Sequence, residues 1–210
     1  MRLVVVSDTH GKPIDPPPGD LLVHCGDLTG RGTPSELEGV EREFRHIEGR
    51  FSHGILFVAG NHDFLFEQDP ERARSIVGTG TYLNDSAATI GGITFWGSPW
   101  TPQFFDWAFM AEDEQLAARW DLIPRNTDVL ITHGPPQGIL DETYRGALAG
   151  SRTLRRAVEA VTPAVHCFGH IHEAYGEATI DGTHFINAAI CNRANEVVNA
   201  AVVVELSPEH

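Results

Sequence analysis

Five short apolar runs recur along the chain, and each is too short to form a helix. They cover residues 3–6, 21–23, 55–58, 129–131 and 165–168. Several are rich in β-branched residues, and continuous apolar runs of this length are typical of strands that are covered on both faces. The pattern therefore predicts buried strands with other elements packed on either side of them.

Helical patterns lie between several of these runs. Thr33-Pro34-Ser35-Glu36 has the sequence of a capping box, with proline at the first helical position. The apolar residues that follow fall on one helical face: Leu37, Val40, Phe44 and Ile47. We expect this helix to end near Gly49, because glycine is favoured just past a helix C-terminus.

Three further helices are predicted from their start signals or periodicity. Asp69-Pro70-Glu71 opens a short one, and Ser151 caps another that ends before Pro163. The apolar stripe of the latter consists of Leu154, Ala157, Val158 and Val161. A third covers roughly residues 112–121.

Two segments have the pattern of antiparallel hairpins. Residues 89–94 and 179–184 each place a two-residue turn with glycine between alternating flanks, and a last strand is expected over 201–204. Strand–helix alternation followed by hairpins predicts an α/β fold of mixed sheets with helices outside. Without internal repeats or a linker, the chain is expected to form a single domain over residues 1–210.

Charge limits the partners. The chain has 15 Lys and Arg against 29 Asp and Glu, a formal net charge of −14. So acidic a protein repels long nucleic acids, because their binding depends on neutralising phosphates with Lys and Arg. A small phosphate ester remains a plausible substrate if bound metal ions supply the positive charge locally.

The termini and cysteines indicate the compartment. The apolar stretch after Met1 is too short for a signal peptide, and no run is long enough to span a membrane. Cys25, Cys167 and Cys191 form no CxxC pair and are expected to be reduced thiols. We therefore expect a cytoplasmic protein without a membrane partner; the sequence carries no signal of oligomeric state.

Metal-ligating side chains follow every apolar run. In chain order the runs lead into Asp8-Thr9-His10, Gly26-Asp27, Gly60-Asn61-His62-Asp63, His133-Gly134 and Gly169-His170-Ile171-His172. In open α/β sheets, ligands bind at the carboxyl ends of the strands. The spacing of two in Asp8-x-His10 and His170-x-His172 suggests extended backbone, with both side chains of each pair on one side.

These residue types suit a pair of divalent cations. A carboxylate can bridge two cations, and imidazole is a good ligand for Zn, Fe, Mn or Ni. Two ions about 3.5–4 Å apart can clamp a phosphate ester and activate water against it. One such motif is weak evidence, but all five in order, each after an apolar run, predict a two-metal site.

The ordered motifs resemble the calcineurin-like metallophosphoesterase superfamily, whose series is D-x-H, G-D, G-N-H-D/E, H and G-H-x-H. Further segments resemble its small metallophosphoesterase-domain (MPPED-like) proteins. These are residues 6–10, 26–29, 97–102, 132–136 and 168–173. The resemblance covers the chain to about residue 190. It implies a four-layer α/β/β/α sandwich of two mixed sheets flanked by helices, and phosphodiesterase activity through a metal-bridging hydroxide.

The resemblance also implies a role for each motif residue. Asp8, His10 and His172 would hold one metal ion, Asn61, His133 and His170 would hold the other, and Asp27 would bridge them. His62 would be the general acid, and Asp63 would orient its imidazole or stabilise the protonated form. The superfamily often has a second Asp, which can pair with the catalytic His, where this chain has Gly30, so the sequence leaves open what orients His62.

Substrate contacts are less well marked. Arg31 matches the superfamily pattern and is a candidate phosphate contact, although it could equally be a solvated loop arginine. Residues 95–107 are rich in aromatics. Trp100 is the first candidate for stacking on a nucleobase, and loop packing against the core is the favoured alternative. A polar lip near His170 and His172, or ordinary turns, would account for Asn187, Asn192, Arg193 and Asn195.

Histidines outside the motifs have simpler explanations. His24 and His166 lie inside predicted strands and are expected to be hydrogen-bonded core residues, and His210 is terminal. The leading hypothesis is a phosphodiesterase for small nucleotides or cyclic nucleotides. A phosphomonoesterase is the alternative within the same chemistry. A binding scaffold of this fold that has lost catalysis is disfavoured, because every motif position is filled.

Overall fold

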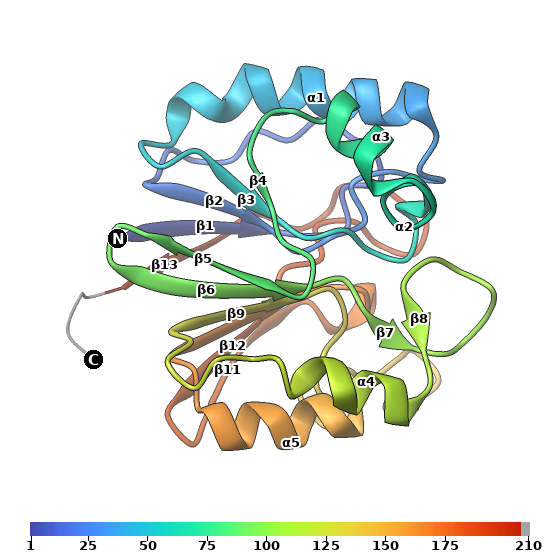
Figure 1. The fold of residues 1–210 in the computed structure, drawn as a ribbon, viewed down its shortest axis with the longest axis vertical. Helices are drawn as coiled ribbons and strands as arrows, with labels where there is room; N and C mark the ends of the chain where they lie inside the picture. Colours follow the sequence, from blue (N-terminus) through green and yellow to red (C-terminus); the bar gives the residue numbers. More distant parts are fainter. Residues whose placement is uncertain (207–210) are drawn as a thin grey trace.

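The computed structural model describes residues 1–206, and these form two face-to-face sheets between two layers of helices (Figure 1). His210 falls outside the described residues. Four-layer packing buries both faces of each sheet, and the burial of all five predicted strand runs follows from it. The predicted α/β/β/α sandwich is confirmed.

The first sheet contains the three N-terminal runs. Its strands lie in the order β13 (Val202–Glu205), β1 (Arg2–Val6), β2 (Leu21–His24), β3 (Ile55–Phe57) and β4 (Thr81–Tyr82). β1 to β4 are parallel, and β13 pairs antiparallel with β1. The outer face of this sheet is covered by α1 (Pro34–Ile47), α2 (Phe64–Gln68) and α3 (Pro70–Ile76).

The second sheet contains the other two runs and both predicted hairpins. Its order is β11 (Gly176–Ile180), β12 (Thr183–Asn187), β10 (Val165–Phe168), β9 (Val129–Thr132), β6 (Ile93–Ser98) and β5 (Ser86–Ile90). The hairpins β5–β6 and β11–β12 are antiparallel, and the inner strands are parallel. It is covered by α4 (Asp113–Trp120) and α5 (Arg152–Val161).

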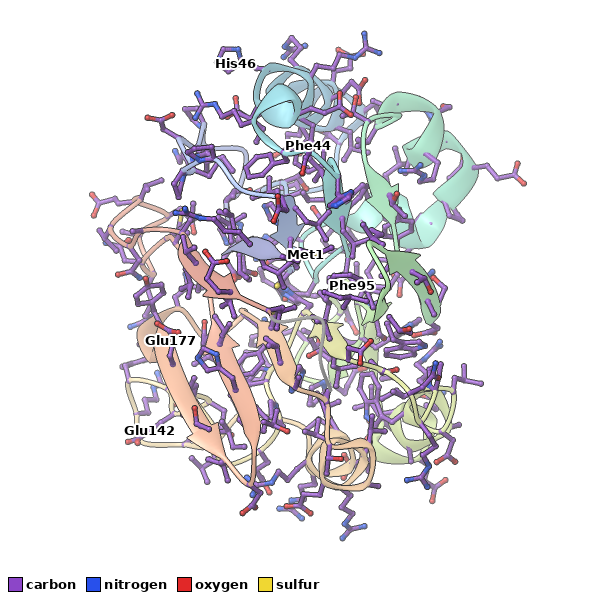
Figure 2. The ribbon with its side chains drawn as sticks, turned by 90° about the vertical axis from the view of Figure 1, so that its left-hand side faces the viewer. Met1, Phe44, His46, Phe95, Glu142 and Glu177 are labelled. Atoms are coloured by element: carbon purple, nitrogen blue, oxygen red, sulfur yellow. The ribbon has the colours of Figure 1, made fainter. Side chains whose placement is uncertain are left out.

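Three apolar layers hold the sandwich together. Phe44 packs between α1 and the first sheet, Phe95 lies between the two sheets, and Trp96 packs under α4 and α5. Figure 2 shows the edge of the sandwich, with Phe44 beneath α1 and His46 on the outer face of that helix. Phe95 and Trp96 are neighbours in β6, so their opposite directions follow from the alternation of side chains along a strand.

Local signals located most of the larger elements. Thr33 caps α1 in a complete capping box with Glu36, Asp69 caps α3, and Ser151 caps α5. The helix α1 ends at Ile47 rather than at Gly49, because a 3-10 turn over Glu48–Arg50 continues the chain. The sequence missed α2, β4 and the two-residue strands β7 (Thr101–Pro102) and β8 (Met110–Ala111). Elements this short carry no periodicity.

Among the described residues, no helix has both the length and the apolar character needed to cross a bilayer.

Candidate metal centre

The predicted ligands meet where the two sheets end. Asp8, Asp27 and Asn61 follow β1, β2 and β3 of the first sheet, whereas His133 and His170 follow β9 and β10 of the second. His10 and His172 lie in the loops that continue from Asp8 and His170. This is the edge of the sandwich opposite Met1, which Figure 1 shows at the left.

The ligand loops turn through left-handed backbone rather than extended backbone. Asp8, His10, Asp27 and His170 have φ values of 56°, 46°, 54° and 69°. The interpretation of the two-residue spacing as extended chain was therefore wrong for these residues. Left-handed backbone is uncommon for residues other than glycine, and its concentration here is typical of a functional site.

Two glycines let the carboxylates approach the neighbouring loops. A Cβ atom at Gly60 would overlap Oδ1 of Asp27, and one at Gly169 would overlap Oδ2 of Asp8. The backbone N–H of His170 donates to Asp8 Oδ2 (2.9 Å). The carboxylate that follows β1 therefore contacts the loop that follows β10. Glycine is required at these two positions because the carboxylates lie so close to the backbone, and not because the backbone adopts a positive φ there.

Short distances between potential ligand atoms define one cluster. Asp8, His10 and His172 offer three such atoms within 4.8 Å of one another, and so do Asp8, Asp27 and His133. Asn61 Oδ1 lies 2.9 Å from His133 Nε2. The ring centroids of His133 and His170 are 5.0 Å apart. The structure therefore brings all seven predicted ligands together: Asp8, His10, Asp27, Asn61, His133, His170 and His172.

Backbone carbonyls fix the tautomer of three ligand histidines. Nδ1–H of His10 donates to Thr29 O (3.3 Å), that of His133 to Cys25 O (2.9 Å), and that of His172 to Asn192 O (3.0 Å). Metal-binding histidines commonly have their second nitrogen bonded in this way. Each neutral ring then directs the lone pair of Nε2 into the cluster.

These lone pairs face other acceptors. His172 Nε2 lies 3.2 Å from Asp8 Oδ1 and 3.3 Å from His10 Nε2, and His133 Nε2 lies 3.4 Å from Asp27 Oδ1. Two acceptors at such distances repel each other unless a proton or a cation lies between them. The donor set of nitrogen, carboxylate and amide oxygen therefore fits divalent cations.

The pKa values describe the same electrostatics without metal. Burial alone would lower the pKa of His133, but the charge and hydrogen bond of Asp27 raise it to about 9. Burial is likewise outweighed at His172, where Asp8 raises the pKa to about 9. Burial lowers the pKa of His170 to about 4, and the charge of His133 adds to this effect. Positive charge is thus favoured at His133 and His172, which lie beside the carboxylates of Asp27 and Asp8, and disfavoured at His170.

The imidazole of His62 is oriented by a backbone carbonyl. Its Nδ1–H donates to Gly30 O at 2.7 Å, and its Nε2 lies 3.9 Å from Asp27 Oδ2. Glu36 braces the same loop, because its Oε1 accepts the N–H of Gly30 at 3.2 Å. A Cβ atom at position 30 would lie 3.0 Å from that oxygen, so Glu36 occupies the space that an aspartate there would need.

Asp63 has a different role from the one predicted. Its buried carboxylate accepts N–H groups from Leu28, Thr29 and Gly60 at 3.1, 2.9 and 2.9 Å, and the Thr29 hydroxyl at 2.7 Å. Burial, together with the charge of Asp27, raises its pKa to about 6. Asp63 therefore fixes the loops that carry Asp27 and Asn61, and Gly30 rather than Asp63 orients His62.

A cavity of about 400 Å³ lies over the cluster. Of the predicted site residues it is lined by His10, Asp27, Asn61, His62, His170 and His172. Its described lining includes neither Arg31 nor Trp100. The Trp100 ring stacks instead under the guanidinium of Arg119, whose Cζ is 3.5 Å from the ring centroid. The packing alternative therefore accounts for Trp100, and Arg31 is exposed.

Residues that were not assigned as site residues from the sequence complete the cavity wall. Phe104, Phe105, Trp107 and Met110 lie on it, as do Glu173, Arg193 and Asn195. The aromatic content of residues 95–107 was a usable signal, but it pointed to the wrong tryptophan. The polar lip is confirmed for Arg193 and Asn195, whereas Asn192 contributes a carbonyl that holds His172.

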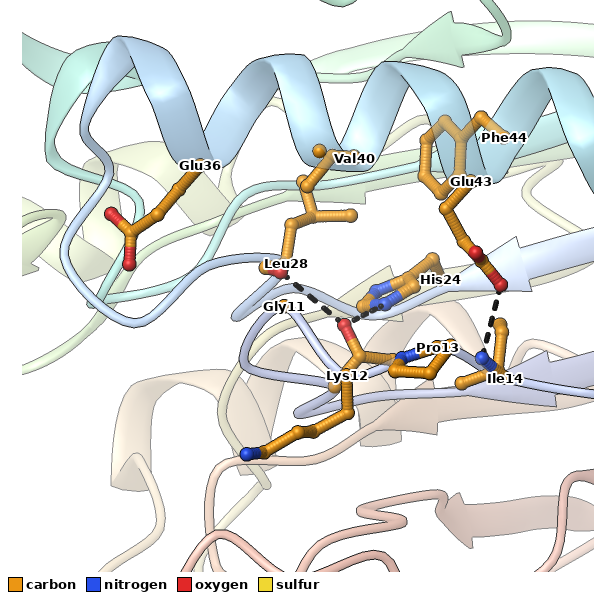
Figure 3. Close-up of a pocket in the computed structure, with 12 residues that line it drawn as sticks. Gly11, Lys12, Pro13, Ile14, His24, Leu28, Glu36, Val40, Glu43 and Phe44 are labelled. Atoms are coloured by element: carbon orange, nitrogen blue, oxygen red, sulfur yellow. Dashed lines mark hydrogen bonds between the residues drawn. The ribbon is translucent and has the colours of Figure 1, made fainter.

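A second, smaller cavity lies behind the ligand loops, beneath α1 (Figure 3). In it, the N–H of Gly26 donates to His24 Nδ1, so Nε2–H of His24 donates to the Thr9 hydroxyl at 3.0 Å. The Thr9 hydroxyl in turn donates to Leu28 O at 3.4 Å. This chain of hydrogen bonds ties the loop of Asp8 and His10 to that of Asp27. His24 is therefore a hydrogen-bonded core residue, as predicted, and burial lowers its pKa to about 3.

Comparison with known proteins finds relatives along nearly the whole chain. Residues 1–174 match the family described as calcineurin-like phosphoesterase. Metallophosphoesterase domain-containing protein 1 of Homo sapiens is 35% identical over 98% of this chain and 71% of its own. A UPF0046 protein of Caenorhabditis elegans is 37% identical over 97% of this chain and 74% of its own. The solved structure of phosphopantetheinyl hydrolase from Mycobacterium tuberculosis shares the fold, with a TM-score of 0.56 and 17% identity over 92% of this chain and 90% of that one.

Proposed function

The chain belongs to the calcineurin-like phosphoesterase family, and from this premise we propose that it is a two-metal phosphodiesterase for small nucleotide or cyclic nucleotide esters. The observation that carries the proposal is the convergence of all five motifs on one acceptor-rich cluster below an open cavity. A scaffold without catalysis would have no need to keep both the ligand set and an oriented histidine beside it.

The ligands divide into two sets around Asp27. Asp8, His10 and His172 would hold one divalent cation, and Asn61, His133 and His170 would hold the other. When bound, the two cations would polarise the phosphate and activate a water molecule as the nucleophile. The backbone carbonyls that accept from Nδ1 keep His10, His133 and His172 in the tautomer that ligation requires.

His62 would supply the proton that the leaving oxygen needs. In its protonated form both ring nitrogens carry hydrogen, and Nε2–H faces the cavity while Nδ1–H stays on Gly30 O. Transfer of the Nε2 proton leaves a neutral ring that still donates through Nδ1, so the orienting hydrogen bond is kept throughout. A positioned acid of this kind typically contributes about 10²–10⁴-fold to the rate.

Cavity size and charge support a small substrate. A volume of about 400 Å³ is within the range of sites for small molecules. The net charge of −14 acts against long nucleic acid strands. A small phosphodiester brings only local negative charge, which the bound cations would neutralise.

The test is hydrolysis of bis-p-nitrophenyl phosphate by protein loaded with Mn²⁺ or Ni²⁺, compared with p-nitrophenyl phosphate. We expect turnover that depends on the metal and a higher kcat/KM for the diester. A higher kcat/KM for the monoester would indicate a phosphomonoesterase. Absence of turnover with every divalent metal, in folded protein, would indicate the scaffold and refute the proposal.

A further inference from the structure

Three large aromatic side chains project from the loop between β7 and β8 to the cavity over the cluster. Phe104, Phe105 and Trp107 are 73%, 58% and 37% exposed, and all three line the cavity together with His62. Scattered exposed apolar residues need no explanation, but a contiguous group at the mouth of a cavity is typical of a binding site.

The base of this loop is fixed to the candidate metal centre. The N–H of Ala108 donates to Asn61 O at 3.2 Å, and the N–H of Phe109 donates to the Glu67 carboxylate at 2.8 Å. Trp107 contacts the imidazole of His62, with ring centroids 4.2 Å apart and planes at 70°. Trp107 and the C-terminal end of the loop are therefore held at a defined place relative to the ligands.

The polar lip of the same cavity has the opposite character. Arg193 and Asn195 line the cavity there, and the guanidinium of Arg193 lies over the Tyr144 ring, with Cζ 3.6 Å from the ring centroid. The cavity wall thus has an aromatic part and a polar part, and the polar part consists of Arg193, Asn195 and Glu173. A phosphodiester has two arms on one phosphorus atom.

We infer that Phe104, Phe105 and Trp107 form a subsite for a planar, uncharged aromatic group on one arm of the ester. This inference rests on the proposed phosphodiesterase function, and it assigns the aromatic arm of the ester to the part of the cavity wall formed by these three side chains. Phe104 and Phe105 pack edge to face, with centroids 4.3 Å apart, which leaves ring surface free for a third ring. Stacking on aromatic side chains rewards a planar ring and gives a methyl group little.

Two diesters with the same leaving group test the subsite. Phenyl p-nitrophenyl phosphate and methyl p-nitrophenyl phosphate differ only in the arm that is retained. We expect the wild-type protein to favour the phenyl ester in kcat/KM. We expect the Phe104→Ala/Phe105→Ala double variant to lower the phenyl-to-methyl ratio by about 5-fold to 150-fold, the range that stacking supplies.

Leu122→Ala is the matched control, because Leu122 is also large, apolar and 57% exposed but is not part of the cavity lining. The control should keep the wild-type ratio. Thermal melts of all variants establish that each is folded. Both esters also carry the aromatic p-nitrophenyl group, so a subsite that holds the leaving arm beside His62 would lower kcat/KM of the two esters equally in the double variant. If the methyl ester is hydrolysed and the double variant keeps the wild-type kcat/KM for both esters, the subsite is refuted while the phosphodiesterase proposal stands.

A binding measurement covers the case in which neither ester is hydrolysed. The phosphodiesterase proposal then fails, and calorimetric titration with phenyl phosphate and methyl phosphate decides on the subsite alone. Tighter binding of phenyl phosphate that is lost in the double variant supports the subsite. Equal affinities of the wild-type protein for the two ligands would overturn it.

Discussion

Replacing His62 with Asn should slow hydrolysis without removing metal. Asn is polar and uncharged and keeps the backbone N–H that donates to Asp27 Oδ1 at 2.8 Å, but it has no proton to give to a leaving oxygen. Loss of a positioned acid should lower kcat by about 10²–10⁴-fold, which corresponds to about 3–5 kcal/mol of barrier. The full effect is expected only for an alkoxide leaving group, since p-nitrophenolate leaves readily without a proton.

Metal content separates the two roles that geometry permits for His62. Its Nε2, that of His10 and a carboxylate oxygen of Asp27 lie within 4.8 Å of one another, so His62 is close enough to act as a ligand. If His62 is the acid, the His62→Asn variant keeps two cations per chain. If it is a ligand, the variant loses one of them, and both kinds of ester then slow together.

The assay therefore measures kcat for a methyl and a p-nitrophenyl leaving group and the metal content of the same samples. His46→Asn is the control, because His46 lies exposed on the outer face of α1 (Figure 2) and should change nothing. Equal loss of kcat for the two leaving groups, together with lost metal, would refute the assignment of His62 as the acid.

Three further predictions follow from the hydrogen bonds and pKa values. Glu36→Ala should lower kcat several-fold for alkyl leaving groups, because it removes the carboxylate that accepts the N–H of Gly30. Thr33→Ala, which also breaks the capping box, should cost about 0.5–2 kcal/mol of stability and leave kcat unchanged. Equal kcat in the two variants would contradict a role of Glu36 in holding Gly30. Burial lowers the pKa of His166 to about 3, so its contribution to stability is present above about pH 6.5 and is lost as pH falls toward 3. In urea titrations of metal-free protein between these pH values, His166→Gln should reduce the slope of unfolding free energy against pH by about 1.4 kcal/mol per pH unit. An unchanged slope would show that His166 does not titrate in this way. Because the pKa values of His133 and His172 are raised, a cation that binds there must displace protons from these two imidazoles. Mn²⁺ affinity measured by calorimetry should therefore increase from pH 6 to about 9. An affinity that does not change with pH would contradict this competition.

The sequence predicted which side chains meet in the cluster because each of the five motifs follows a buried strand. Strand direction and burial place Asp8, Asp27 and His133 at one edge of the sandwich, and both properties can be read from short apolar runs. The left-handed backbone of Asp8 and Asp27 was not predictable, since it depends on contacts between loops that are far apart in the sequence.

The groups around the ligands depend on tertiary contacts. Gly30 orients His62 through a carbonyl, which any residue could supply, so residue identity gave no signal. Asp63 adjoins His62 in the sequence, yet its carboxylate binds the loop of Leu28 and Thr29. In the aromatic segment, composition could not distinguish rings buried by strand β6 from those exposed in the next loop.

The most direct test of the central claim is anomalous diffraction from crystals of this protein soaked in Mn²⁺. We expect two manganese peaks about 3.5–4 Å apart, one on each side of the Asp27 carboxylate, with His62 bound to neither ion. A single peak, or ions at places remote from Asp27, would contradict the two-metal centre.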